Sequence, residues 1–71
     1  MKNKDELIYD LIFSENTSYT IDVSDYLEDI YDYEDFVADI KLVLKKSKVI
    51  IVKSGVMVNS KTVIWELKVK K

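Results

Sequence analysis

No cysteine and no histidine occur among the 71 residues of this chain, and this absence limits its possible folds more than any other feature. Disulfides are excluded, and the usual ligands of a structural zinc site are missing. The core of so short a domain supplies only about 3–5 kcal/mol, so such domains often depend on these cross-links. We therefore expect one domain, residues 1–71, which is stabilised by apolar packing. An oligomer interface is the other source of stability open to such a chain. Its hydrophobic fraction of 48% is sufficient for such a core.

The first half of the chain is predicted to contain a helix, a short strand and a second helix. Asn3 and Glu6 form a capping-box pattern ahead of apolar residues at helical spacing, which predicts a helix over Lys4–Phe13. Alternating residues predict a strand over Tyr19–Val23. Ser24 is a candidate N-cap for a second helix that ends at about Tyr31. The side chains that this helix is predicted to bury are Leu27, Ile30 and Tyr31.

A third, longer helix is predicted to begin at Asp32 or Tyr33 and to end at Lys46. Glu34 and Asp35 lie in its first turn and lysines lie in its last turn, placements that complement the helix dipole. Its buried face is predicted to consist of five apolar residues at helical spacing, Phe36, Val37, Ile40, Val43 and Leu44.

The last part of the chain is predicted to be a long β-hairpin, with strands over Lys48–Met57 and Thr62–Lys70 joined near Asn59 and Ser60. Every second residue of the later strand is apolar, and we expect Trp65 to be buried between the hairpin and the helices. The residues of this apolar face are Val63, Trp65, Leu67 and Val69.

The predicted register of the hairpin pairs Val58 with Lys61. This register places Lys53 opposite Glu66, a favourable cross-strand charge pair. Gly55 is the candidate position for a β-bulge. The apolar pairs that follow on one face are Ile50 with Val69, Val52 with Leu67, and Val56 with Val63.

The predicted order is helix, short strand, helix, helix and long β-hairpin, an α+β arrangement. The residues that define it are Tyr19-Thr20-Ile21, Tyr26-Leu27, Phe36, Ile40, Leu44 and the run Lys46-Ser47-Lys48-Val49-Ile50-Ile51. Over nearly the whole chain this order resembles the winged-helix branch of the helix-turn-helix superfamily. The resemblance implies a winged-helix-like fold in which the third helix enters the DNA major groove and the hairpin forms the wing.

The chain departs from this family at the surface that would read DNA. Carboxylates in the third helix would be repelled by phosphates. The chain has no arginine for guanine contacts, and this surface has no Asn or Gln for adenine. The residues expected there are Tyr33, Glu34, Asp35, Val37, Ala38 and Asp39. The resemblance in fold therefore does not settle the function.

Charge is divided unequally between the two parts of the chain. Met1–Ile40 contains twelve acidic residues and two lysines, a formal charge of −10, whereas Lys41–Lys71 contains nine lysines and one acidic residue, a charge of +8. All five tyrosines lie in the acidic part. Such asymmetry points to electrostatic partners.

The acidic, tyrosine-bearing segment is the first candidate site. Asp25, Glu28, Asp29 and Asp32 are spaced to form one stripe along the second helix. Two interpretations stay open, a solvated face that also compensates helix dipoles, and an anionic surface that binds a basic protein. The candidate partner-binding residues are Asp22, Asp25, Tyr26, Glu28, Asp29, Asp32, Tyr33, Glu34, Asp35 and Asp39.

The lysines of the hairpin region are the second candidate site. Lysine on an edge strand often only prevents strands of different molecules from pairing. The alternative is a basic wing that contacts phosphates or an acidic partner. The candidate nucleic-acid-binding residues are Lys45, Lys46, Lys48, Lys53, Lys61 and Lys68.

Other function classes are disfavoured by the sequence. Histidine and cysteine, the commonest bases and nucleophiles, are absent, and no glycine-rich phosphate loop occurs, so we expect no enzyme and no cofactor. The carboxylate spacing does not match a calcium loop, so we expect no metal site. No signal peptide or membrane span is visible, and the cytoplasm is the expected location.

Three hypotheses follow. The leading one is a small non-enzymatic regulatory protein that binds a basic, nucleic-acid-binding protein through its acidic Tyr-rich face; in type it resembles the DNA-mimic inhibitors of bacteriophages. The second is a DNA-binding transcriptional regulator that uses the lysine-rich wing. The third is a self-associating structural protein, a homo-oligomer driven by its oppositely charged parts.

Overall fold

Two helices and three strands form in a computed structural model that describes all 71 residues. The α+β class predicted from the sequence is confirmed. Two short 3₁₀ turns, η1 and η2, stand between the first strand and the second helix. In chain order the elements are α1 (Lys4–Phe13), β1 (Ser18–Asp22), η1 (Val23–Tyr26), η2 (Ile30–Asp32), α2 (Tyr33–Lys46), β2 (Ile50–Val58) and β3 (Val63–Lys70).

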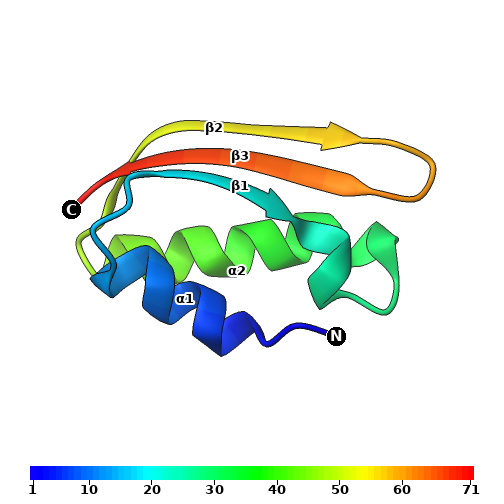
Figure 1. The fold of residues 1–71 in the computed structure, drawn as a ribbon, viewed down its shortest axis with the longest axis horizontal. Coiled ribbons are helices and arrows are strands. Elements are labelled where there is room, and N and C mark those ends of the chain that lie inside the picture. Colours follow the sequence, from blue (N-terminus) through cyan, green and yellow to red (C-terminus); the bar gives the residue numbers. More distant parts are fainter.

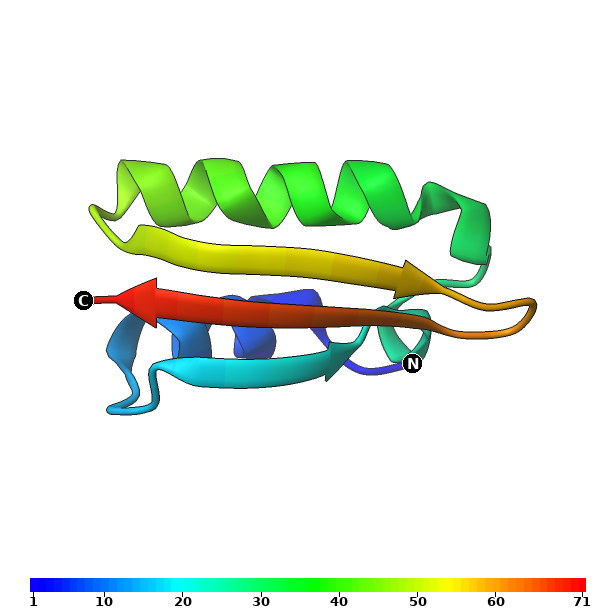
Figure 2. The same cartoon turned by 90° about the horizontal axis from the view of Figure 1, so that it is seen from above.

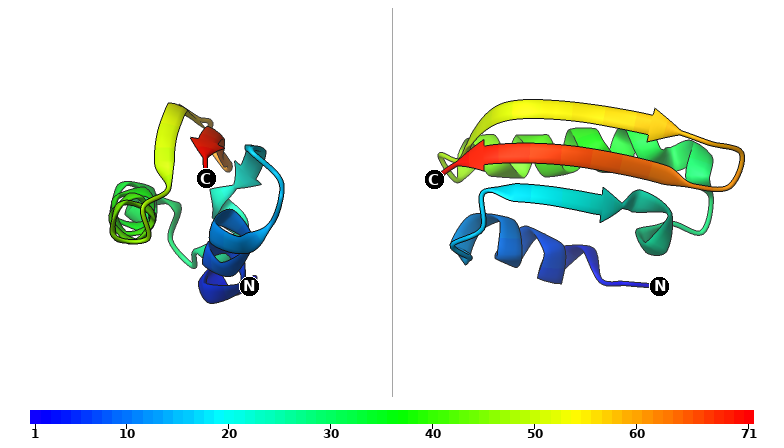
Figure 3. Two further views of the ribbon diagram at one scale, coloured as in Figure 1. Left: turned by 90° about the vertical axis from the view of Figure 1, so that its left-hand side faces the viewer. Right: turned by 45° about the horizontal axis from the view of Figure 1, so that its top comes forward.

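The three strands form one antiparallel sheet in the order β1-β3-β2, so β3 is central and β2 lies at an edge. Both helices lie on the same side of this sheet (Figure 1). Seen from above, α2 runs alongside β2, and α1 lies beneath the region of β1 and β3 (Figure 2). The end-on view in Figure 3 shows the helices below the sheet.

The core forms where the predicted apolar faces meet. Trp65 is 0% exposed, which confirms that it is buried, and its indole Nε1 donates a hydrogen bond to Ser54 Oγ at 2.8 Å. Ile21 of β1 pairs with Trp65 across the sheet. The buried residues of β3 and α2 are Val63, Trp65, Leu67, Val69, Phe36, Val37, Ile40 and Leu44, and Val43 is half-buried.

The second helix of the predicted order does not form. Asp22, not Ser24, is the N-cap of η1, and its carboxylate accepts hydrogen bonds from the backbone N–H of Ser24, at 3.1 Å, and from the Ser24 hydroxyl. The chain is extended at Leu27, and Asp29 Oδ1 then accepts from Tyr31 N at 2.9 Å to begin η2. Aspartate side chains bond the backbone locally and so compete with helix formation. The first turn ends where the chain becomes extended at Leu27, and Asp29 then begins a new turn at a position where the predicted helix would have continued.

The predicted hairpin register is wrong by two residues. Val58 pairs with Val63, because the connection has four residues and closes with a hydrogen bond from Asn59 N to Thr62 O at 2.8 Å. Lys53 consequently lies opposite Lys68, and Glu66 lies opposite Gly55. The register shift that marks a bulge falls between Ile51 and Lys53 and not at Gly55.

The C-terminus of α2 is closed by two backbone hydrogen bonds of the Schellman type. Lys48 N donates to Lys45 O at 3.1 Å, and Val49 N donates to Leu44 O at 2.9 Å. This geometry gives Lys48 a φ of 62°, a left-handed conformation that favours glycine.

We expect Lys48→Gly to raise the free energy of unfolding by up to about 1 kcal/mol, because glycine removes the left-handed penalty of a Cβ-bearing residue at some cost in unfolded-chain entropy. Urea denaturation measures the change. Lys46→Gly, a matched loss of lysine at the last residue of the helix, should lower stability by up to about 1 kcal/mol. Equal destabilisation by both variants would contradict the prediction.

Candidate functional site

Much of the charge of the chain is concentrated at the two ends of the molecule. The molecule has principal extents of 33 × 21 × 18 Å, and η1, η2 and the first turn of α2 lie together at one end (Figure 1). We call this the acidic end and define it by its exposed carboxylates, Asp25, Glu28, Asp29, Asp32, Glu34 and Asp35. The last turn of α2 and the end of β3 lie at the opposite, basic end, which we define by Lys45, Lys46, Lys48, Lys70 and Lys71.

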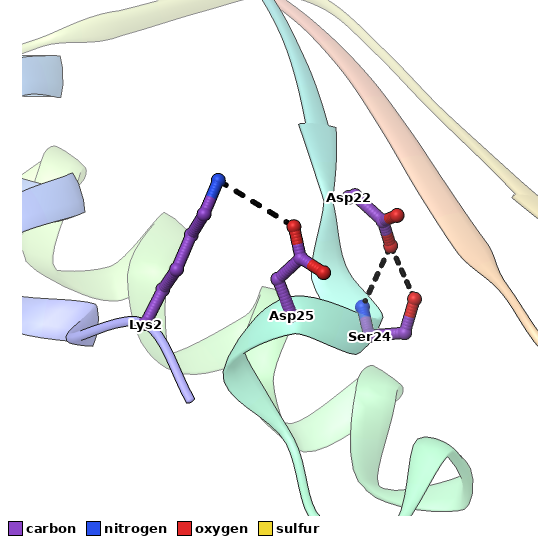
Figure 4. Close-up of polar contacts among 4 residues, drawn as sticks. All are labelled: Lys2, Asp22, Ser24 and Asp25. Atoms are coloured by element: carbon purple, nitrogen blue, oxygen red, sulfur yellow. Dashed lines mark hydrogen bonds and ion pairs between the residues drawn. The ribbon is translucent and has the colours of Figure 1, made fainter.

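The carboxylates of the acidic end are almost all without a cationic partner. The only ion pair in the chain joins Lys2 Nζ to Asp25 Oδ2 at 3.5 Å (Figure 4). Both side chains are largely exposed, so this pair contributes little to stability. The negative charge of this end is therefore available to a partner rather than consumed within the fold.

The predicted stripe of four carboxylates does not exist as one helical face, because its helix is absent. Asp25 belongs to η1, and Glu28 and Asp29 lie in the segment between the turns. Asp32 is the N-cap of α2 and makes no side-chain capping bond. These residues nevertheless stay exposed and lie at the same end of the molecule.

Two further predicted site residues lie differently. Asp22 is half-buried, and its bonds to Ser24 give it a structural role. Asp39 is exposed in the middle of α2, outside the acidic end.

The tyrosines are placed differently from the prediction. Tyr26, a predicted site residue, is half-buried and packs on Phe36 with ring centroids 5.5 Å apart. Tyr31, predicted to be buried, is 84% exposed and lies in η2 at the acidic end. The signal that could have indicated a turn here is Asp29, two residues earlier, whose carboxylate accepts a hydrogen bond from the backbone N–H of Tyr31.

Tyr33 is half-buried beside Glu34, to whose Oε1 its hydroxyl donates a hydrogen bond at 3.2 Å. Desolvation raises the pKa of the Tyr33 phenol above its ordinary value of 10.0, and the hydrogen bond to Glu34 and the charge of that carboxylate act in the same direction. Because the folded-state pKa is raised, the related stability is fully present below the unfolded-state value and is lost as the pH rises through the folded-state pKa.

We expect Glu34→Gln to lower the pKa of Tyr33 toward its ordinary value, because it removes the carboxylate charge while the burial remains. NMR titration of the tyrosine ring signals resolves this group from the other tyrosines. Asp35→Asn, which removes a neighbouring charge that makes no bond to Tyr33, is the control. An unchanged Tyr33 titration in Glu34→Gln would show that the carboxylate of Glu34 does not raise the pKa of Tyr33.

The predicted lysine site is divided among three places. Lys45, Lys46 and Lys48 belong to the basic end, whereas Lys61 lies in the hairpin loop. Lys53 and Lys68 are paired on the solvent face of the sheet, where like charges opposite one another are unfavourable. A shallow groove beside this pair includes Gly55 and is lined also by Ser18, Thr20 and Glu66.

Lys71 has a structural role that the sequence does not indicate. Its Nζ donates to the carbonyl oxygen of Ser14 at 2.6 Å and to the hydroxyl of Tyr19 at 3.0 Å. That hydroxyl donates in turn to the carbonyl of Asp10 at 3.1 Å. These bonds join the end of β3 to the C-terminus of α1, which has no basic residue of its own in its last turn.

The geometry defines a two-layer α+β domain with a charge-divided surface. No three of its carboxylates are grouped so that they could hold a metal ion. Neither helix has the length and apolar character needed to cross a membrane. Comparison with protein-family models, with curated proteins and with solved structures gives no match. The function is therefore argued from this chain's own residues.

Proposed function

We propose that this chain is a small regulatory protein without enzymatic activity, which binds a basic protein through its acidic end. The partner is a nucleic-acid-binding protein, and the acidic end occupies the surface that would otherwise bind phosphates. The chain acts in this way as a DNA-mimic inhibitor. The observation that carries the proposal is the group of exposed carboxylates at one end, of which only Asp25 has an ion-pair partner.

The chemistry of the acidic end supports a protein as the partner. Carboxylates that are not neutralised within the fold attract a basic surface and speed its association. Tyr31 adds a large amphipathic side chain at the same end, and tyrosine is enriched in protein interfaces. Duplex DNA, in contrast, would be repelled by this end.

The test is competition for a basic protein. Fluorescent duplex DNA is first bound by a basic, sequence-tolerant DNA-binding protein, and this chain is then added. Release of the DNA, with no binding of DNA by this chain alone, is the expected result. If every basic protein of a broad panel keeps its DNA, the proposal is wrong.

The alternative function is a winged-helix-like transcriptional regulator that contacts DNA through lysines. The order of α1, β1, α2 and the hairpin supports such a fold, with two 3₁₀ turns in place of one helix. The grouping of Lys45, Lys46 and Lys48 at the basic end favours phosphate contacts there. An electrophoretic shift of bare duplex DNA that weakens steeply with salt would make this the better account.

A further inference from the structure

The free edge of β2 differs from the other edge of the sheet. β2 has nine residues, pairs only with β3 and contains one charged side chain, Lys53. β1, at the other edge, has five residues, of which Ser18, Thr20 and Asp22 are polar. Edge strands are normally protected by shortness, charge or bulges, and β2 has only one lysine and one bulge. Its exposed apolar side chains are Ile50, Val52, Val56, Met57 and Val58.

Two hollows lie along this edge, where α2 runs beside β2 (Figure 2), and because both include Lys41 we call them together the groove. Near the start of α2 the groove is lined by Tyr33, Glu34, Val37, Ala38, Lys41 and Val56. Near the end of α2 it is lined by Lys41, Lys45, Lys48, Val49, Ile50 and Ile51. The groove therefore has an apolar floor, a carboxylate at one end and lysines at the other.

We infer that the occupant of this edge is a second copy of the chain, with the two β2 strands paired antiparallel about a two-fold axis. The backbone N–H and C=O groups that β2 turns away from β3 would then be satisfied. The two sheets would join into one of six strands. The groove shares Glu34 with the acidic end, but the inference does not depend on the acidic-end proposal.

One pair of charges in the groove, Glu34 and Lys45, fits a copy of the same chain. A two-fold axis reverses the second groove, so Glu34 of each copy meets the lysine end, Lys45 and Lys48, of the other. The groove side of α2 reads Glu34, Ala38, Lys41, Lys45, and an antiparallel copy brings Glu34 to Lys45 twice. An isologous interface needs such self-complementarity.

Charge exchange provides the decisive test, because Glu34 and Lys45 of one chain cannot meet. They are eleven residues apart in one helix, about 16 Å at a rise of about 1.5 Å per residue. Glu34→Lys and Lys45→Glu should each raise the dimer dissociation constant roughly tenfold or more, since each places like charges together. The double variant, and an equal mixture of the two single variants, should restore the dimer because both arrangements recreate two opposite-charge contacts.

Sedimentation equilibrium reads the mass directly, as 8.3 kDa for one chain or twice that value. A second pair of variants tests the strand edge: Val52→Lys with Val58→Lys should give a monomer, and Thr20→Lys on β1 should leave the dimer unchanged. Circular dichroism checks that each variant is folded. The inference would be overturned if the unmodified protein were a monomer at every concentration. It would also be overturned if the dimer were unchanged by Val52→Lys with Val58→Lys, or if neither the double variant nor the mixture restored the dimer.

Discussion

Trp65→Ala is expected to leave most of the protein unfolded at room temperature. The indole is completely buried in the central strand, and removal of so large a side chain costs about 3–5 kcal/mol. A domain of this size without a cross-link has a total stability of about the same magnitude. The far-ultraviolet circular dichroism of the variant, before and after addition of a stabilising osmolyte, measures the loss.

Trp65→Phe is the matched control. It keeps most of the apolar volume but loses the hydrogen bond from the indole to Ser54 Oγ. We expect it to remain folded, with a lower urea midpoint than the unmodified protein. A cooperative, nearly unchanged unfolding transition in Trp65→Ala would show that the core does not depend on this residue.

Neutralising the acidic end is expected to slow association with a basic partner by roughly tenfold or more, because attraction between opposite charges raises on-rates by factors of about 10 to 10³. The variant combines Glu28→Gln, Asp32→Asn and Asp35→Asn, three exposed carboxylates that make no side-chain hydrogen bond. Surface charges contribute little to stability, so the thermal midpoint should change little. Stopped-flow association with the basic protein identified by DNA release gives the rate.

The control removes the same amount of charge from α1 and the segment that follows it, with Glu6→Gln, Asp10→Asn and Glu15→Gln, all exposed. Its association rate should fall much less, and the salt dependence should become shallow only in the acidic-end variant. Equal effects of the two variants would mean that net charge, and not the acidic end, governs binding.

The sequence predicts the regular elements where local signals agree with packing. The cap at Asn3 and the spacing of Leu7 and Leu11 predict α1 with the bounds that it has. The buried stripe and the charged ends of α2 predict that helix equally well. The second helix fails because the chain is extended at Leu27 and Asp29 begins a new turn inside the predicted helix, and the apolar periodicity does not indicate either feature.

The site is predictable only in part. The accumulation of carboxylates before residue 40 indicates an acidic surface, and all of these carboxylates except Asp22 are exposed although the predicted second helix is absent. The prediction of which tyrosine is exposed beside these carboxylates relied on a helix that does not form. Tyr31, predicted to be buried, is exposed, and Tyr26, predicted to be a site residue, packs on Phe36. The groove beside β2 depends on how α2 packs against the sheet, and the pattern along one element cannot indicate it.

The separation of the two ends has a consequence for the electrostatic field that an approaching molecule experiences in solution. Its length of 33 Å exceeds the Debye length of about 8 Å at physiological ionic strength several-fold. A molecule that approaches either end therefore experiences that end alone, and the small net charge of −2 describes neither. At about 0.01 M salt the Debye length grows to about 30 Å, comparable with the whole molecule. Only in such dilute salt would both ends act together as a single electric dipole.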